Sequence, residues 1–429
     1  MRVLITGAHG FIGRHILAAL LRAGHEPVAA VRPERARTPP PGAQTLACDL
    51  AADLDPALWQ ARLEGIDAVV NCAGILRETR AGDFDRIHRA APLALAQAAA
   101  QTGVKRFVQI SALGDPADGE FVASKHRGDA AILHSGVAAV VLRPSVVCST
   151  RGSYGGTTLL RALAALPWIA LPGAGEQRLQ PLDADDLAAA VLAALEQPQA
   201  VGQCLELGGP QAIALRDYLA LWRRWLGLGR ARFLAVPASV ARAGAWLGER
   251  FGRGPLGLTM WRMLERGNVV SAPSLAHSCA VLDWSPVTLE LALARHGASS
   301  ADRLQARTAL LQPLLRLTLA ATFLASGAVG LALPPERVDA LFVDAGLATA
   351  WSAPLALGGS LADLALGLWL LVTRRPRRVL AAMALLVLGY TAFIGLLLPA
   401  AWLDPFGGLL KNGLVLVAIA LAAAGAERQ

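Results

Sequence analysis

Three glycines near the start of the chain have the spacing of a phosphate-binding turn. Gly7, Gly10 and Gly13 follow a short apolar run at residues 3–5 and open an apolar helical pattern over residues 11 to about 23. A strand, a glycine turn and a helix N-terminus in this order present backbone N–H groups and the positive end of the helix dipole to a pyrophosphate. The pattern predicts a dinucleotide site. An ordinary glycine-rich turn is the alternative, because the spacing is G-x-x-G-x-x-G rather than G-x-G-x-x-G.

A basic residue follows the second predicted strand, residues 28–31. Arg32 stands where NAD-binding proteins usually carry an acid that accepts from the ribose hydroxyl, and Arg35 and Arg37 are close by. An arginine pairs with a 2′-phosphate, so the sequence favours NADP(H) over NAD(H). Glu34 lies in the same segment, and a solvated basic loop is the alternative.

Short apolar runs alternate with helical patterns along the first half of the chain. Strands are expected at residues 46–50, 67–71, 106–110 and 139–142, with a helix over 84–101. This alternation predicts an α/β fold, a doubly wound parallel sheet with helices on both faces. Ligands of such sheets bind at the carboxyl ends of the strands. The residues expected at those ends are Gly7, Arg32, Asp49, Ala73 and Ser111.

Six short segments carry a resemblance to a known family. T-G-A-H-G-F-I-G, C-D-L, N-C-A-G, I-S-A, S-K and L-R-P-S resemble the extended and atypical short-chain dehydrogenase/reductases over about residues 1–295. The branch that includes alpha subcomplex subunit 9 of respiratory complex I is the most similar. The resemblance implies an NAD(P) site with these residues: Gly7, His9, Gly10, Phe11, Ile12 and Gly13 at the pyrophosphate, Arg32 at the adenosine ribose or its phosphate, Asp49 and Leu50 beside the adenine, and Ala73 and Gly74 towards the nicotinamide.

The catalytic motif departs from that family. Its members use a Tyr-x-x-x-Lys pair on one helix, in which the lysine lowers the pKa of the phenol that exchanges a proton with substrate. Here Phe121 replaces the tyrosine and Lys125 is present, and no tyrosine of the chain has a lysine four residues later. The resemblance implies that Lys125 holds the nicotinamide ribose and that Ser111 is the catalytic serine. A serine that bonds to the backbone at a strand end is the alternative for Ser111.

Residues 151–300 are expected to cover the substrate. The segment 151–156 is loop-like, and in the family it lies over the nicotinamide. A helix follows residues 182–187, with Asp185 or Asp186 as its N-cap. Residues 213–270 are rich in Leu, Ala, Trp and Arg, so the pocket between this part and the nucleotide part is expected to be apolar and to fit a quinone, lipid or isoprenoid.

The last third of the chain changes composition. Residues 317–333, 348–372, 379–398 and 409–426 are apolar runs long enough to cross a bilayer, which predicts an all-α transmembrane bundle of about four helices. The expected domains are 1–300, with a nucleotide part over about 1–150 and a substrate-side part over about 151–300, and 301–429. Ser326-Gly327 and D-P-F-G-G-L-L-K-N, residues 404–412, resemble the DoxX-like family. Asp363 is either a functional mid-membrane acid or an acid bonded to Ser360 or a neighbouring helix.

Arginines set the expected orientation. Arg303, Arg307 and Arg316 precede the first span, and four more arginines lie between the second and third. By the positive-inside rule, the nucleotide domain and both termini face the cytoplasm, at a bacterial inner membrane. No basic stripe is interleaved with aromatics, so nucleic acid is not expected as a partner. The five scattered cysteines favour reduced thiols over disulfides or a metal site.

Three functions remain open from the sequence. The first is a membrane-anchored NAD(P)H-binding oxidoreductase of the atypical short-chain family that acts on an apolar substrate at the cytoplasmic membrane face. The second is a non-catalytic nucleotide-binding scaffold or redox sensor in a membrane complex, supported by the missing phenol. The third is a small transporter or quinone-handling unit, supported by Asp363 and the four spans.

Overall fold

The computed structural model describes residues 1–36, 38–250, 257–373, 375–403 and 408–426. The chain divides into two compact units, residues 1–306 and 307–429. Arg37, Arg374 and Asp404, which entered the sequence argument, lie outside the described residues, as does the D-P-F-G part of the last motif. Each unit is described by itself.

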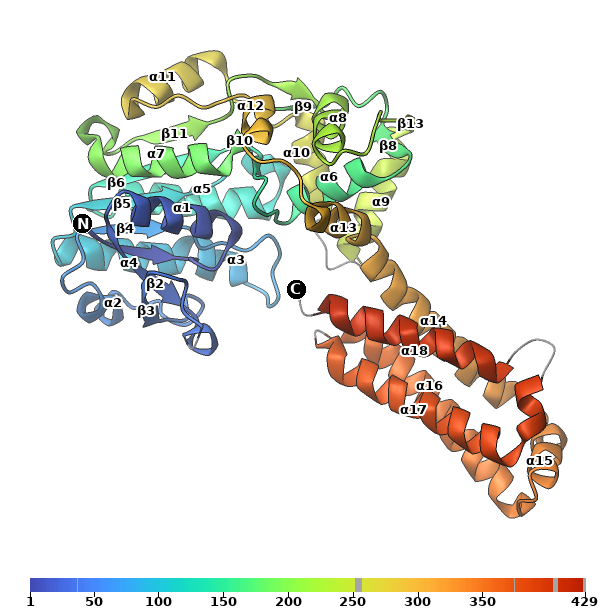
Figure 1. Ribbon diagram of the computed structural model, residues 1–429. Coiled ribbons are helices and arrows are strands. Elements are labelled where there is room, and N and C mark those ends of the chain that lie inside the picture. Colours follow the sequence, from blue (N-terminus) through green and yellow to red (C-terminus); the bar gives the residue numbers. More distant parts are fainter. Residues whose placement is uncertain (37, 251–256, 374, 404–407, 427–429) are drawn as a thin grey trace. The chain divides into compact units, whose positions relative to one another are not determined.

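A seven-stranded parallel sheet forms the centre of unit 1 (Figure 1). Its strand order is β11-β6-β5-β4-β1-β2-β3. The strands are β1 (Arg2–Thr6), β2 (Glu26–Val31), β3 (Gln44–Ala47), β4 (Ala68–Asn71), β5 (Arg106–Ile110), β6 (Ala139–Pro144) and β11 (Cys204–Leu207). β2 and β3 extend the sheet on one side of β1, and β4, β5, β6 and β11 extend it on the other side. The direction in which strands are added therefore reverses between β1 and β4, and sheets of this kind bind ligands at that point.

Helices cover both faces of the sheet. On one face, α1 (Phe11–Arg22) and α7 (Ala184–Glu196) share a core with Val3 and Ile5 of β1. On the other, α2 (Pro56–Arg62) and α4 (Ala91–Gln101) share a second core with Leu4. Successive side chains of one strand therefore enter opposite cores, as a strand buried on both faces requires. The α/β doubly wound prediction is confirmed.

One predicted helix cap is wrong. α7 begins directly after β10 (Leu182–Asp183), so the N-cap is Asp183, whose carboxylate accepts from the Asp185 N–H at 2.9 Å. Asp185 and Asp186 lie in the first turn instead. Asp185 bonds to His15 and Arg151, and Asp186 accepts from the Val287 N–H. The partners of both aspartates are far from them in the sequence. A capping rule, which uses local sequence alone, therefore assigned both acids incorrectly.

A third core lies in the rest of unit 1. Its elements are α6 (Gly156–Ala165), β8 (Ile169–Pro172), α8 (Leu215–Trp225), β13 (Phe233–Val236), α10 (Leu258–Arg266) and α12 (Leu289–Ala294). This part of the chain also contains α9 (Ala238–Arg250) and α13 (Ser300–Thr308), whereas α11 (Ala272–Leu282) packs into the core of α1 and α7. Arg161 is buried in the third core, with its guanidinium stacked on Trp222 and Trp225. It donates to the carbonyls of Ser149 and Gly152, both at 2.7 Å. This arginine therefore fixes the loop that leads into α6.

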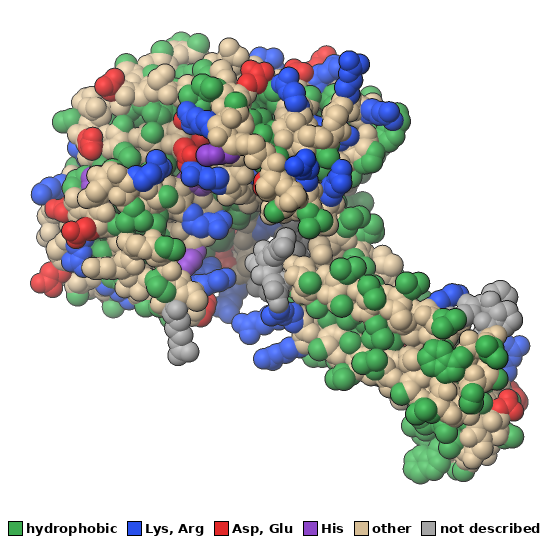
Figure 2. Space-filling view, viewed as in Figure 1, with side chains coloured by type: hydrophobic (Ala, Val, Ile, Leu, Met, Phe, Trp, Pro, Cys, Tyr) green, Lys and Arg blue, Asp and Glu red, His purple; other side chains and the backbone are tan. Residues whose placement is uncertain are grey.

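Unit 2 contains four helices long and apolar enough to cross a membrane. They are α14 (Leu311–Ala332), α16 (Ser352–Val372), α17 (Pro376–Leu397) and α18 (Gly408–Gly425), and the short α15 (Pro335–Asp344) follows α14. Figure 2 shows hydrophobic side chains along this bundle and charged ones at its ends. α14 begins before the predicted apolar run at residues 317–333, and within it the Arg316 guanidinium donates to the carbonyls of Leu370 and Thr373. The chain is a multi-pass membrane protein.

Small residues bring α14 and α16 into close contact. A Cβ at Gly327 would lie 2.6 Å from the Ser360 carbonyl oxygen, and a Cβ at Gly367 would lie 2.9 Å from Leu324. Ser326 donates to the buried Asp363 carboxylate at 2.7 Å, so that acid bonds to the neighbouring helix, whereas Ser360 donates to Ala356. The predicted Ser326-Gly327 pair is thus the contact point between two helices.

A methyl group at Gly327 is expected to destabilise the bundle. Gly327→Ala forces α14 and α16 apart, at a cost of about 1–3 kcal/mol, and lowers the thermal midpoint in detergent. Gly389→Ala on α17 is the matched control, because nothing lies within 4 Å of a Cβ there. Equal midpoints for the two variants would contradict the close contact.

Candidate functional site

The glycine turn leaves no room for side chains. Gly7 has φ +66°, and a Cβ there would lie 2.9 Å from the Cys72 carbonyl oxygen. A Cβ at Gly13 would lie 2.2 Å from the Gly7 carbonyl oxygen. Gly10 is the N-cap of α1 and supplies no side-chain cap. The first N–H groups of α1 are therefore left to an external acceptor, which is the arrangement that a pyrophosphate requires.

A buried polar chain fixes the strand ends beside this turn. Thr6 bonds through its hydroxyl to Asn71, and the Asn71 amide donates to Gln109 at 2.7 Å. The Ala73 N–H donates to the Thr6 hydroxyl at 3.3 Å. These three side chains lie at the ends of β1, β4 and β5, and the sequence analysis did not single out Thr6 or Gln109. The signal available was a polar residue at the end of each apolar strand.

The residues predicted for the adenosine lie at the same edge of the sheet. Arg32 follows β2 and is exposed, and Asp49 and Leu50 follow the neighbouring β3. The Asp49 carboxylate accepts from the Ala51 N–H at 3.0 Å, so it orders its own turn. His9 bonds to the Thr38 carbonyl at 3.0 Å and links the glycine turn to the loop after β2.

A cavity of about 330 Å³ joins the glycine turn to the predicted catalytic residues. Phe11, Ile12 and Gly74 form one part of its wall, and Ser111, Phe121 and Lys125 form another. The remaining lining is largely apolar, and from α6 and α10 it includes Leu159, Leu160, Met260, Trp261, Met263 and Leu264. The structure therefore brings together residues that the sequence placed in two separate motifs.

Lys125 is buried at the wall of this cavity. Its Nζ donates to the Ile110 carbonyl at 3.1 Å, and a Cβ at Gly74 would lie 3.3 Å from the same atom. Burial lowers the pKa of Lys125, and the nearby Asp129 opposes that shift. An ammonium group with one backbone acceptor keeps donors for a ligand hydroxyl, which suits the ribose role that the resemblance implies.

Phe121 rests on a buried histidine that the sequence analysis missed. The Phe121 and His88 rings are edge to face, 5.8 Å between centroids. The Ile75 N–H donates a hydrogen bond to His88 Nε2 at 3.1 Å, so the ring proton is on Nδ1. The Nδ1–H group donates a hydrogen bond to the Ser124 hydroxyl oxygen at 2.8 Å. Burial and then the Lys125 charge lower the pKa of His88 to about 3. His88 lies in a π-helical turn, Arg86–Ala90, which no sequence pattern predicted.

The Ser111 hydroxyl is committed to a carboxylate. It donates to Asp129 Oδ2 at 2.7 Å, and Arg143 Nε donates to the same oxygen at 3.0 Å. A serine hydroxyl has a single proton, so towards the cavity Ser111 presents only lone pairs. The partner is a side chain and not the backbone, contrary to the alternative considered for this residue.

One tyrosine lines the cavity. Tyr154 comes from the loop before α6, and of the three tyrosines it is the one that contributes to this wall among the described residues. Tyr218 is buried in the third core and Tyr390 lies in α17. Partial burial raises the pKa of Tyr154, so the phenol stays protonated. Arg151 holds this loop to α1 through the Asp185–His15 pair.

Comparison with known proteins identifies both parts of the chain. Residues 3–208 match the NAD dependent epimerase/dehydratase family, and residues 320–420 match the DoxX-like family. The chain joins an epimerase/dehydratase domain to a DoxX-like domain. Both resemblances that the sequence predicted are confirmed, and the domain belongs to an NAD(P)-binding oxidoreductase family. Among the described residues, no group of three or more His, Cys, Asp or Glu side chains is placed to hold a metal.

Several characterised proteins are similar to the epimerase/dehydratase domain. The (4-alkanoyl-5-oxo-2,5-dihydrofuran-3-yl)methyl phosphate reductase of Streptomyces griseus is 29% identical, over 52% of this chain and 74% of that protein. NADH dehydrogenase [ubiquinone] 1 alpha subcomplex subunit 9 of Arabidopsis thaliana is 27% identical, over 56% and 61%. The ceramide reductase of Caulobacter vibrioides is 30% identical, over 34% and 46%. MoeE5 in complex with UDP-glucose and NAD shares the fold, with TM-score 0.51 and 19% identity over 72% of this chain and all of MoeE5.

Acid is expected to destabilise unit 1 through His88. The folded-state pKa lies below the ordinary value of about 6.5, so the unfolded chain binds the proton first as the pH falls. Stability should be constant above pH 6.5 and fall between pH 6.5 and 3, by about 2 kcal/mol at pH 5. Denaturant unfolding at pH 8 and pH 5 measures the loss.

His88→Gln is the control, because it removes the titrating ring and keeps an amide donor and acceptor. This variant should be less stable at pH 8 and should lose about 2 kcal/mol less than the wild type on going to pH 5. The same pH dependence in both proteins would show that other groups cause it.

Proposed function

We propose that the chain is a membrane-anchored, NADP(H)-preferring oxidoreductase that acts on an apolar substrate at the cytoplasmic membrane face. The cavity carries this proposal, because it joins the glycine turn and Lys125 to a largely apolar lining. In this reading residues 1–150 bind the nucleotide and residues 151–300 enclose the substrate. Two of the similar proteins are reductases whose names specify an alkanoyl or ceramide substrate, which supports an apolar group here.

The cofactor fits the turn for a steric reason. Gly7 and Gly13 keep the backbone clear of side chains, and the uncapped first turn of α1 offers its N–H groups to the two phosphates. When bound, the nicotinamide dinucleotide supplies the hydride. Lys125 donates to the nicotinamide ribose, and the exposed Arg32 pairs with the phosphate of the adenosine ribose.

Proton transfer needs a donor other than the family's tyrosine. Phe121 has no proton to give, and the Ser111 proton is committed to Asp129. Tyr154 supplies a phenol from the lining of the same cavity and completes the reduction of the substrate. Its raised pKa keeps it protonated until above about pH 10.

Nucleotide titration is the first test. Protein purified in detergent should bind NADPH more tightly than NADH, followed by nicotinamide fluorescence, and should oxidise NADPH when a quinone or a long-chain carbonyl compound is added. Arg32→Gln should weaken NADPH binding about 10- to 100-fold and leave NADH binding unchanged. Gly13→Ala, which places a methyl group against the Gly7 carbonyl, is the non-binding control. Equal effects of Arg32→Gln on both nucleotides would refute the NADP preference.

Removal of the Tyr154 hydroxyl separates catalysis from binding. Tyr154→Phe should lower NADPH oxidation about 100-fold or more, with nucleotide affinity retained, because only the proton donor is lost. Turnover equal to the wild type would assign the proton to water. Tight nucleotide binding with no oxidation by any acceptor would instead favour a non-catalytic scaffold or redox sensor, a role that the replaced tyrosine and the similar complex I subunit support.

A further inference from the structure

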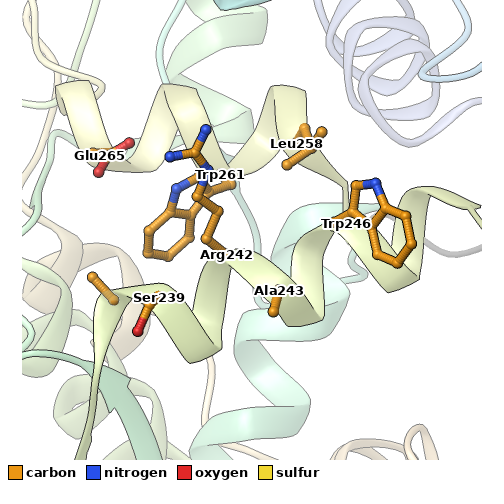
Figure 3. Close-up of a pocket in the computed structure, with 8 residues that line it drawn as sticks. Ser239, Arg242, Ala243, Trp246, Leu258, Trp261 and Glu265 are labelled. Carbon is orange, nitrogen blue, oxygen red and sulfur yellow. The ribbon is translucent and has the colours of Figure 1, made fainter.

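An open groove lies between α9 and α10, on the outer side of the cavity wall. Its volume is about 610 Å³, and it is lined by Ala238, Ser239, Arg242, Ala243 and Trp246 of α9 and by Leu258, Trp261 and Glu265 of α10. Figure 3 shows Arg242 and Trp261 between the two helices, with Glu265 towards one end of the groove and Trp246 towards the other. Trp261 also lines the 330 Å³ cavity. One indole therefore borders both spaces.

α9 exposes an apolar face. Ala245 is its buried residue, whereas Val240, Trp246 and Leu247 are 57%, 52% and 50% exposed. Val240, Ala243 and Leu247 recur at helical spacing on one side, with Trp246 and the arginines 242 and 250 beside them. Aromatic and aliphatic residues next to arginines are typical of helices that lie in a membrane interface.

α10 is held rigidly as the partner of α9. Arg266 pairs with the buried Asp118 at 2.8 Å, and Arg262 donates to the carbonyl of the same aspartate. The Glu249 carboxylate accepts from the Leu258 N–H at the start of α10. The groove is therefore formed by two helices fixed to each other and to the nucleotide domain, and its exposed apolar surface belongs to the folded state.

The positive charge around α9 and α10 indicates what kind of surface their exposed apolar face would bind. Residues 215–266 contain ten arginines and three acidic residues, which accounts for most of the chain's net charge of +8. Figure 2 shows such basic side chains gathered over α8 and β13, next in sequence to α9. Arg223 is buried and Arg266 is paired with Asp118, but an anionic lipid surface attracts the exposed arginines, such as Arg242, and accepts the apolar residues between them.

The membrane is within reach of unit 1. Residues 309 and 310 alone separate α13 from α14, the first apolar span. Because the chain tethers unit 1 to the apolar spans, the effective concentration of lipid at the surface of unit 1 is high. A protein partner would have to compete with this surface for the same face.

We propose that the α9–α10 face of unit 1 binds the surface of an anionic bilayer, with Trp246, Leu247 and Val240 inserted between lipids and Arg242 at the headgroups. Because Trp261 borders both the groove and the cavity, this contact opens the cavity towards the lipid. That consequence rests on the proposed function, whereas the bilayer contact does not.

Brominated lipids test the contact directly. Full-length protein is placed in nanodiscs of phosphatidylcholine and phosphatidylglycerol, with and without bromine on the acyl chains, and Leu247→Trp is compared with Leu58→Trp. Leu58 is 48% exposed on α2, which matches the 50% of Leu247. The fluorescence that each new tryptophan adds over the wild type is measured. The emission added at residue 247 should be shifted to the blue and lost with brominated lipid, and the emission added at residue 58 should persist.

Trp246→Phe supplies an independent measurement of tryptophan emission at this face, without an added tryptophan. The emission that it removes should be quenched by brominated lipid, as a part separate from the quenched emission of Trp351, Trp369 and Trp402 in and next to the spans. Emission at residue 247 that is neither blue-shifted nor quenched, like that expected at residue 58, would place the α9 face in water and overturn the proposal. Blue-shifted but unquenched emission at residue 247 would assign the face to a second copy of the chain and overturn it as well. None of these readings requires nucleotide or turnover, so they stand apart from the proposed function.

Discussion

The close approach of α1 to the end of β1 is the constraint on which the rest of unit 1 depends. With a side chain at Gly13 the helix would have to move away from the Gly7 carbonyl, and with one at Gly7 the turn would strike the end of β4. Because the helix begins so close to the sheet, its uncapped N–H groups lie at the carboxyl edge, next to the strand ends that Thr6 and Asn71 tie together. Phe11 and Ile12 then fall at the mouth of the cavity.

The second constraint is the burial of polar groups around Lys125. Replacing a tyrosine by phenylalanine removes a hydroxyl that neighbouring donors would otherwise use, and unsatisfied buried groups are costly. Here two polar side chains near this position have partners: His88 bonds to Ile75 and Ser124, and Ser111 shares Asp129 Oδ2 with Arg143. The Phe121 ring fills the remaining space against His88. A phenylalanine at residue 121 therefore leaves neither the His88 nor the Ser111 side chain without a partner.

The sequence predicted what depends on local pattern and missed what depends on contacts across the fold. The strand, glycine turn and helix at residues 2–22 are specified by adjacent residues, and β5 is found where it was expected, at Arg106–Ile110. Asp183 was passed over as the cap of α7 because the start of a helix depends on where the preceding strand ends. Tyr154 lines the cavity from a loop, and His88 packs against Phe121 from a π turn. Neither position has a periodicity that would reveal it. Arg316 precedes the apolar run but lies within α14, and its hydrogen bonds to carbonyls at the end of α16 could not be read from the sequence.

Joining a nucleotide-binding domain to membrane helices has a physical advantage when the substrate is apolar. Each methylene group favours the bilayer over water by about 0.8 kcal/mol, so a substrate with a long chain is almost absent from the aqueous phase around an untethered enzyme. A cavity lined by leucine and methionine side chains has no affinity advantage over lipid for such a chain, since both surroundings are equally apolar. Under the proposed function, binding then comes from the polar end of the substrate, at Lys125, Ser111 and Tyr154, and from the proximity that the four spans impose. A small polar end inside a mostly apolar cavity is what the lining of this site provides.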